Sequence, residues 1–159
     1  MTGLRAASLG VPFEPVPGFR DTDLPATADF RTVTDPWSGE EIYVVPALRP
    51  RWALLHVQEA DASGNARIFG SPGYDLLMAQ AADQVILTTE RIVPSEELAR
   101  MPELTRISDL SVAAVVEVPG GARPGDCPGC YDVDEPGVRR YLDAARTAWG
   151  LKAYLESTS

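Results

Sequence analysis

The sequence has little cysteine and little histidine, which limits the chemistry that it can support. Its 159 residues include two cysteines, Cys127 and Cys130, and a single histidine, His56. Two cysteines are too few for a disulfide framework, so we expect reduced thiols. A structural zinc site needs four ligands, and with one histidine it would have to recruit carboxylates or another chain.

Basic residues are in the minority, and long apolar runs are absent. The chain has 14 Lys and Arg against 23 Asp and Glu, a formal net charge of −9. Nucleic acid and anionic membranes bind clustered basic side chains, so neither is an expected partner. No apolar run reaches the roughly 18 to 20 residues that span a bilayer, and residues 1–10 lack the apolar stretch of a signal peptide. These absences predict a cytoplasmic protein.

Several familiar active-site signatures are also missing. No serine lies in a G-x-S-x-G setting, so a Ser/His/Asp hydrolase is poorly supported. Neither a P-loop nor a G-x-G-x-x-G pattern occurs, so phosphates are not held by those loops.

The length allows one domain at most, and its first part is irregular. Prolines recur from Pro12 to Pro36 with glycines between them, and proline fixes φ and removes an amide donor. We therefore predict that residues 1–41 form an extended, Pro-rich segment lying along something larger, and that residues 42–159 form the folded part.

Residues 42–159 alternate between strand and helix patterns. The expected strands are 42–45, 52–57, a short return at 66–69, 85–87 and 112–118, and the expected helices are 74–82, a short one from Ser95 as N-cap, one from about Glu135 and one around 151–155. The nearly unbroken apolar runs at 52–57 and 112–118 predict strands buried on both faces, with 112–118 in the centre of the sheet. The pattern indicates an open, mostly parallel α/β sheet that is a partial domain.

Polar residues gather where two of these strands end. His56 and Gln58 close one strand, Gly64 and Asn65 lie in the turn after it, and Glu90 ends the next strand. Ligands of open α/β sheets bind outside the carboxyl ends of the strands, so this group is expected to face a cleft. Two alternatives remain open, because a lone histidine is often a satisfied core group and Gly-Asn is ordinary turn chemistry.

The segment Cys127-Pro128-Gly129-Cys130 is a C-x-x-C motif. This motif can be a redox pair, half of a zinc site or a plain loop. A redox pair usually begins a helix after a strand, which lowers the thiol pKa, whereas here a Gly- and Pro-rich loop surrounds it. The plain loop is therefore the favoured interpretation.

Ordered blocks from Leu4 to the C-terminus resemble the C-terminal half of the A (alpha) subunit of the family I CoA-transferases, the glutaconate CoA-transferase-like group. The blocks that carry the resemblance are Leu4 to Ala7, Leu9 to Val16, Thr22 to Leu24, Thr34 to Glu41, Val45 to Pro50, His56 to Gln58, Ala60 to Asp61, Gly64 to Ala66, Ala81 to Ile86, Glu90 to Pro94, Val115 to Pro119 and Cys127 to Gly129.

The resemblance implies an open sheet of the CoA-transferase (NagB/RpiA-like) type, with residues 42–159 as the C-terminal part of an A-subunit-like α/β domain. It also implies a hetero-oligomer with a partner B (beta) subunit, and an acyl-CoA and a carboxylic acid as substrates. Coenzyme A is then a substrate, with no permanently bound cofactor. No metal site is expected in this chain, because it has too few cysteine and histidine ligands. In this family the thioester is attacked by a glutamate, usually one on the B subunit, and CoA passes through a glutamyl-CoA intermediate.

It follows that no nucleophile is expected in this chain. The acyl-CoA cleft candidates are His56, Gln58, Gly64, Asn65 and Glu90. The only E-x-G match to the family's nucleophile is Glu135-Pro136-Gly137, which is interpreted as a helix start because proline suits the first turn.

The sequence departs from the family at two positions. Arg123 stands where a histidine is frequent, and Cys130 stands where an aromatic residue is common. Alternatives therefore stay open: an acyl-CoA hydrolase or decarboxylase on the same fold, a truncated non-catalytic assembly or CoA-contacting subunit, or a small redox protein using both cysteines.

Overall fold

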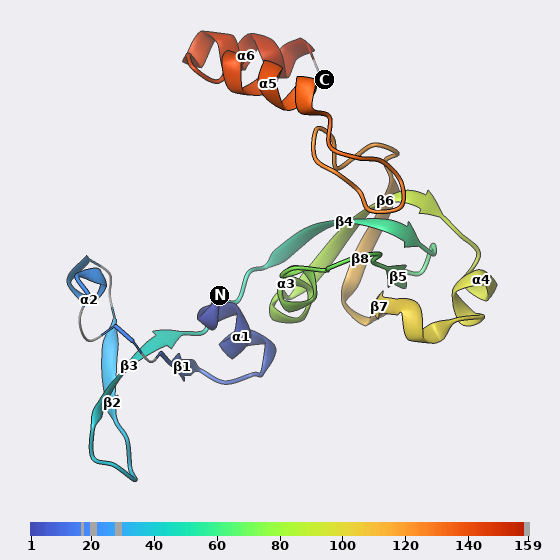
Figure 1. Ribbon diagram of the computed structural model, residues 1–159. Helices are drawn as coiled ribbons and strands as arrows, with labels where there is room; N and C mark the ends of the chain where they lie inside the picture. Colours follow the sequence, from blue (N-terminus) through green and yellow to red (C-terminus); the bar gives the residue numbers. More distant parts are fainter. Residues whose placement is uncertain (17, 20–21, 28–29, 158–159) are drawn as a thin grey trace.

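The computed structural model describes residues 1–16, 18–19, 22–27 and 30–157 (Figure 1). The chain forms a small N-terminal sheet, a larger mixed sheet and a C-terminal helix pair that stands away from both sheets. No helix in these ranges is long and apolar enough to cross a membrane.

The N-terminal sheet is antiparallel, in the order β1-β3-β2. Its strands are β1 (Phe13–Pro15), β2 (Arg31–Thr34) and β3 (Glu41–Pro46). The strand predicted at 42–45 is therefore present as β3. Because β3 pairs with both β1 and β2, this sheet joins the two sides of the boundary predicted at residue 41.

The predicted extended segment 1–41 also contains helices, α1 (Thr2–Ser8) and α2 (Leu24–Thr27). The expectation was wrong at α1 because the first proline is Pro12, so nothing stops a helix before it. Ala6 and Ala7 are buried where α1 packs on helix α3 (Asp75–Ala81) and on β3. Positions 17, 20–21 and 28–29 of the segment lie outside the described residues.

The larger sheet has five strands in the order β7-β5-β4-β6-β8. Strand β4 runs parallel to β6 and β6 runs parallel to β8, whereas β5 is antiparallel to β4 and to β7. Its elements are β4 (Trp52–Ala60), β5 (Ala66–Arg67), α3 (Asp75–Ala81), β6 (Gln84–Ile92), α4 (Ser95–Ala99), the 3-10 turns η1 (Pro102–Leu104) and η2 (Asp109–Ser111), β7 (Thr105–Ile107) and β8 (Val112–Glu117).

One face of this sheet is covered and the other is open. Along β4 and β6 alternate side chains point to opposite faces, and Leu55, Val57 and Leu87 form the core together with α3. On the other face Leu54 is 73% exposed and Val116 is 48% exposed. The prediction that 52–57 is buried on both faces was therefore wrong for this chain, in which apolar residues occupy both faces but only one is packed.

The prediction of a central strand at 112–118 was also wrong. Strand β8 lies at an edge of the sheet and pairs only with β6 among the described residues. An apolar run indicates that a strand is suited to burial, but it does not fix where the strand lies in the sheet order.

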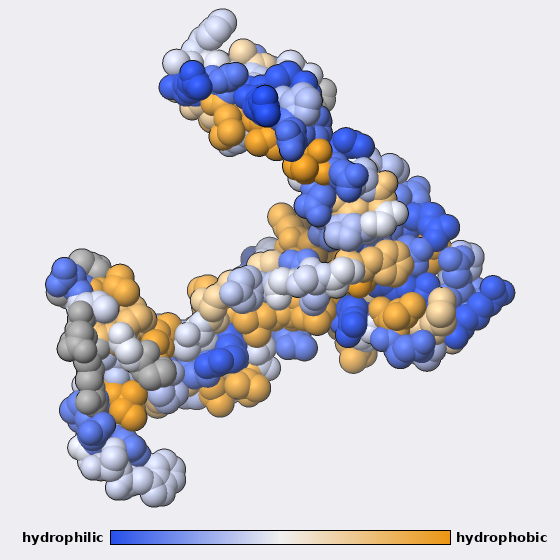
Figure 2. Space-filling view, viewed as in Figure 1, coloured by the Kyte–Doolittle hydropathy of each residue, from blue (hydrophilic) through white to orange (hydrophobic). Residues whose placement is uncertain are grey.

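The chain ends with α5 (Glu135–Ala144) and α6 (Ala148–Ser157), which pack on each other. Asp134 caps α5, because its carboxylate accepts a hydrogen bond from the Gly137 amide at 3.0 Å. Tyr141 and Tyr154 meet edge to face with ring centroids 5.7 Å apart. Apolar surface is visible on this pair and along the sheet in Figure 2.

Candidate functional site

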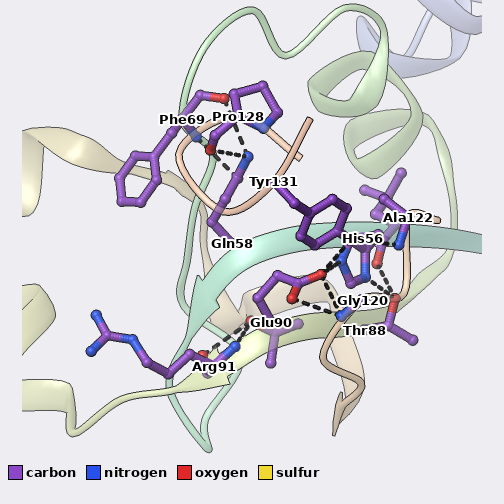
Figure 3. A network of polar contacts seen from close by, with 12 residues as sticks. His56, Gln58, Phe69, Thr88, Glu90, Arg91, Gly120, Ala122, Pro128 and Tyr131 are labelled. Carbon is purple, nitrogen blue, oxygen red and sulfur yellow. Dashed lines mark hydrogen bonds and ion pairs between the residues drawn. The ribbon is translucent and has the colours of Figure 1, made fainter. Parts of the chain in front are cut away.

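His56 and Glu90 meet on the open face of the sheet, near the carboxyl ends of β4 and β6 (Figure 3). His56 Nε2 lies 2.7 Å from Glu90 Oε1, and His56 Nδ1 lies 2.9 Å from Thr88 Oγ1. The side chains of His56 and Glu90 are only 16% and 10% exposed. Because a carboxylate only accepts hydrogen bonds, the proton between this pair belongs to Nε2.

Glu90 also holds the loop that follows β8. Its two carboxylate oxygens accept hydrogen bonds from the Gly120 amide at 3.0 and 2.8 Å, and Oε1 accepts another from the Tyr131 hydroxyl at 2.6 Å. Burial raises the pKa of Glu90, but the hydrogen bonds from Tyr131, Gly120 and His56 outweigh burial, so its pKa lies below the ordinary value. Glu90 is therefore an ionised acceptor with a partner on each carboxylate oxygen.

Tyr131 links two parts of the loop. Its hydroxyl accepts a hydrogen bond from the Ala122 amide at 3.0 Å and donates to Glu90. Burial and the contact with Glu90 raise the pKa of Tyr131 to about 12. The Arg123 guanidinium lies 4.4 Å from the centre of the Tyr131 ring, in cation–π contact.

The loop approaches the imidazole so closely that Gly121 has no room for a side chain. A Cβ on Gly121 would lie 2.6 Å from His56 Cε1. Glycine at this position is what lets the backbone lie against the histidine.

Gln58 binds the same loop from the other side. Its amide nitrogen donates to the carbonyl oxygens of Phe69 and Pro128 at 3.4 and 3.3 Å, and its carbonyl oxygen accepts from the Phe69 amide at 3.1 Å. A cavity of about 300 Å³ opens beside it, lined by Gln58, Glu59, Phe69, Glu90, Arg91, Gly129 and Cys130.

Gly64 and Asn65 lie in a different cluster, centred on the carboxylate of Asp61. Asp61 Oδ1 accepts from the amides of Ser63, Gly64 and Asn65 at 2.9 to 3.0 Å. Asp61 Oδ2 accepts from the Asn65 side chain at 3.0 Å and from the Ser95 hydroxyl at 2.8 Å. Burial raises the pKa of Asp61, but these hydrogen bonds together lower it by more, so the net shift is downward.

The Asp61 cluster borders a second cavity, of about 530 Å³, which is lined by Asp61, Asn65, Ser95, Leu98, Ala99, Pro102, Thr105 and Ser108. The expectation that Ser95 is an N-cap was wrong, because Pro94 holds that position and the Ser95 hydroxyl serves Asp61 instead.

The structure thus divides the five predicted residues. It brings His56 and Glu90 into contact and places Gln58 on the same loop, whereas Gly64 and Asn65 belong to the Asp61 turn. A role for any of them in acyl-CoA binding stays a prediction. Sequence reasoning missed Thr88, Gly120 and Tyr131, and for Tyr131 the only signal was its place directly after the C-x-x-C motif.

A buried ion pair lies next to this network. Glu59 Oε2 is 3.2 Å from Arg67 Nη1, and Arg91 also pairs with Glu59. Arg67 further donates to the carbonyl oxygens of Glu97 and Leu98 at 2.9 and 3.2 Å, which ties β5 to α4. The carboxylate of Glu59 is therefore occupied by cations.

The site can position groups and can hold a cation. Both nitrogens of His56 and both oxygens of Glu90 already have partners, so neither is poised as an unpaired base or nucleophile. Three donor groups, from His56, Glu90 and Cys127, have ligand atoms within 4.8 Å of one another. Among the described residues this is the group that could coordinate a metal ion.

Residues 1–118 match the family model described as Coenzyme A transferase. This chain belongs to the coenzyme A transferase family. The family predicted from the sequence is thereby confirmed, and the match ends at the last residue before the loop that binds Glu90.

Relatives with named activities align over nearly the whole chain. The A subunit of glutaconate CoA-transferase from Acidaminococcus fermentans is 34% identical over 166 residues, covering 94% of this chain and 52% of its own length. The cholesterol ring-cleaving hydrolase IpdA subunit of Mycobacterium tuberculosis is 33% identical over 165 residues, covering 98% of this chain and 56% of its own length. The chain therefore spans about half the length of these curated relatives.

Solved structures show the same fold. The crystal structure of the Acidaminococcus fermentans glutaconate CoA-transferase superposes on 98% of this chain with a TM-score of 0.91 and 32% identity, covering 54% of its own chain. A variant of the decarboxylase AibA/AibB superposes on 98% with a TM-score of 0.84 and 38% identity, covering 58% of its own chain. The predicted α/β fold of the CoA-transferase type is confirmed.

Proposed function

We propose that this chain is the A-subunit portion of a CoA-transferase-like enzyme that moves CoA between an acyl-CoA and a carboxylic acid. The nucleophilic glutamate, which forms the glutamyl-CoA intermediate, comes from a partner B subunit. Coenzyme A is a substrate here, and the acyl-CoA lies against the open face of the sheet near His56 and Glu90.

The observation that carries this proposal is the state of the glutamates at the carboxyl ends of β4 and β6. Glu90 accepts from Tyr131, Gly120 and His56, and Glu59 is paired with two arginines. A nucleophilic carboxylate must be free to attack the thioester carbon, and these two are held by their donors. The nucleophile is therefore supplied from outside this chain.

Glu135 does not change this conclusion. It begins α5 and pairs with Arg139 one helical turn later, at 3.7 Å. Helix α5 belongs to the pair that stands away from the sheet in Figure 1. This position supports the interpretation of Glu135 as a helix-start residue.

The open face next to the site supports an assembly in which other protein completes the cleft. Leu54 and Val116 are exposed on the face that carries His56 and Glu90. A cleft that excludes water needs a second wall over such a face.

The test is co-expression with a B-type subunit encoded next to this chain. The purified complex is assayed for CoA transfer between a panel of acyl-CoAs and free acids, and each of the two separate chains serves as a control. We expect transfer by the complex only, with loss of transfer when the B subunit's nucleophilic glutamate is replaced. Turnover by this chain alone, abolished by replacing one of its own glutamates, would overturn the proposal.

A second candidate function is hydrolysis or decarboxylation of an acyl-CoA. The aligned relatives favour it, because one is named a ring-cleaving hydrolase and another a decarboxylase. The same complex, assayed without an acceptor acid, separates the two functions. Release of free CoA or of carbon dioxide under these conditions identifies the second function, and dependence on the acceptor identifies transfer.

A further inference from the structure

The proposed transfer reaction does not use the C-x-x-C motif. Cys127-Pro128-Gly129-Cys130 forms a tight turn in which the Cys127 carbonyl accepts from the amides of Cys130 and Tyr131 at 2.9 and 3.0 Å. Gly129 takes a φ of 85°, which favours glycine. Cys127 is buried and Cys130 is exposed, and both are free thiols. The motif lies beyond residue 118, where the match to the family model ends, although Cys127 to Gly129 is one of the blocks that resemble the A subunit.

The turn places a sulfur atom beside the His56–Glu90 pair. The ligand atoms of His56, Glu90 and Cys127 all lie within 4.8 Å of one another. A tetrahedral zinc ion binds nitrogen and oxygen at about 2.0–2.2 Å and sulfur at about 2.3 Å, which places its ligand atoms roughly 3.3–3.8 Å apart. The three groups therefore need only small side-chain shifts to surround one ion.

A fourth donor is at hand in Cys130. Cys130 lies outside the group of three, but its thiol hydrogen-bonds with that of Cys127 across the turn, and its side chain is exposed. Two cysteines separated by two residues are the spacing found in structural zinc sites. The carboxylate that such a site needs beside the single histidine is provided by Glu90 on β6.

The surrounding groups already orient these ligands. A zinc-binding imidazole donates its other ring N–H to an acceptor, and His56 Nδ1 faces Thr88 Oγ1 at 2.9 Å. The Thr88 hydroxyl in turn donates a hydrogen bond to the Leu55 carbonyl oxygen at 3.4 Å. The Gly120 amide and the Tyr131 hydroxyl hold the Glu90 carboxylate in place.

We propose that His56, Glu90, Cys127 and Cys130 bind a zinc ion that ties the loop after β8 to β4 and β6. On binding, both thiols lose their protons to solvent, and the imidazole proton moves from Nε2 to Nδ1, where Thr88 accepts it. The Glu90 carboxylate and the two thiolates carry three negative charges and the zinc ion carries two positive charges, so the site has one negative charge in excess. The Arg91 cation lies close enough to Cys130 to interact with it electrostatically.

The test is metal titration of the full chain, kept reduced and stripped with a chelator. Cobalt(II) is the probe, because tetrahedral thiolate coordination gives an intense sulfur-to-metal charge-transfer band, and zinc is then added to displace it. We expect one cobalt per chain, a charge-transfer band, loss of the band on adding zinc, and two thiols that zinc protects from alkylation.

The decisive variant is Cys130→Ser, because Cys130 is exposed and its replacement leaves the core intact. Mutating residues that only hydrogen-bond the metal ligands weakens metal binding by about 10–100-fold. Loss of a ligand itself should therefore weaken binding at least ~100-fold. The matched control is Asp132→Asn, an exposed acid in the same loop, which should leave affinity within about twofold.

Three results would overturn the proposal. They are cobalt binding without a thiolate band, unchanged affinity in Cys130→Ser, and equal losses in Cys130→Ser and Asp132→Asn. Circular dichroism of each variant checks that the fold is retained. The readouts need no enzymatic activity, so they are independent of the proposed transfer reaction.

Discussion

Asp61 and Glu90 are carboxylates with little solvent exposure near the carboxyl ends of neighbouring parallel strands, but their partners lie at different distances along the chain. Four of the five groups that hydrogen-bond Asp61 come from residues 63–65, and the fifth is Ser95. Glu90 is held by His56, Gly120 and Tyr131, which lie 34, 30 and 41 residues away. The first carboxylate makes a turn, whereas the second gathers three distant segments into one site.

The difference indicates what each residue contributes. A carboxylate satisfied by its own turn contributes mainly to the stability of that turn. A carboxylate that joins two strands to a long loop fixes the position of that loop, including Gly120 and Tyr131, relative to the sheet. The two clusters can therefore be separated by measuring stability and activity on the same variants.

The largest expected effect is loss of stability in Asp61→Ala. The change leaves buried amides and the Ser95 hydroxyl without their acceptor, so the free energy of unfolding should fall by roughly 3 kcal/mol. Urea denaturation measures it, and Asp83→Ala, at an exposed position, is the control, expected within about 0.5 kcal/mol of the parent chain. An Asp61→Ala chain as stable as the control would mean that the turn does not depend on its carboxylate.

Glu90→Gln should affect activity more than stability. The neutral amide cannot accept all four contacts, so the loop that carries Gly120 and Tyr131 shifts. A displacement of this kind can lower kcat/KM roughly 100-fold. The free energy of unfolding should fall by about 1 kcal/mol.

The measurement for Glu90→Gln uses the assembled enzyme, with kcat and KM determined separately and urea denaturation run in parallel. Glu103→Gln, at an exposed position, is the matched control. Equal kcat/KM values in the two variants would show that Glu90 has no role in the activity of the assembled enzyme.

Acid pH should weaken both clusters. Each carboxylate has a folded-state pKa below its ordinary value near ~4, so the stability it contributes is present above that value and is lost as pH falls through the folded-state pKa. Unfolding free energies measured from about pH 5 downward should fall less steeply in Asp61→Asn than in the parent chain. A parallel decline in the two chains would show that Asp61 is not perturbed on folding.

Asn65→Ala tests whether the turn also faces substrate. The Asn65 side chain donates to Asp61 and accepts from the Asp109 amide at 3.3 Å, so both of its polar groups are used within the protein. We expect a loss of about 1 kcal/mol in unfolding free energy and a change in kcat/KM below about twofold. A tenfold loss of kcat/KM at unchanged stability would instead assign Asn65 to the acyl-CoA cleft.

The smallest expected effect is that of Glu135→Gln. An exposed ion pair one helical turn apart contributes about 0.3–0.5 kcal/mol, so stability and transfer activity should both be nearly unchanged. Loss of activity in the assembled enzyme would place the nucleophile in this chain.

Local hydropathy patterns in the sequence predicted most of the secondary structure, because strands and helices depend on the spacing of nearby apolar residues. Most strands and helices from residue 42 onward follow from apolar runs and helical spacing, and α5 begins at the predicted Glu135. The short strand β7 and the 3-10 turns η1 and η2 on either side of it were not predicted. The contact between His56 and Glu90 also follows from one rule, because parallel neighbours end at the same edge of a sheet.

Properties set by the rest of the molecule were not predictable in this way. The edge position of β8 depends on strand order, and the exposure of Leu54 depends on what covers the sheet. Tyr131 reaches Glu90 because an irregular loop folds back through its own backbone hydrogen bonds, which no periodic pattern encodes. Helix α1 was not predicted, because the prolines that follow it led us to assign the whole of residues 1–41 to an extended segment.

The C-terminal helix pair has a consequence for how the chain moves. Gly137 is its only buried residue among those described, and Trp149 and Leu155 are exposed. With so little buried surface, the pair can open without disturbing the sheet, so its amides should exchange with solvent deuterium at much lower free-energy cost than those of β4 and β6. We therefore expect amide exchange to divide this part of the chain into a slow-exchanging sheet and a fast-exchanging helical hairpin.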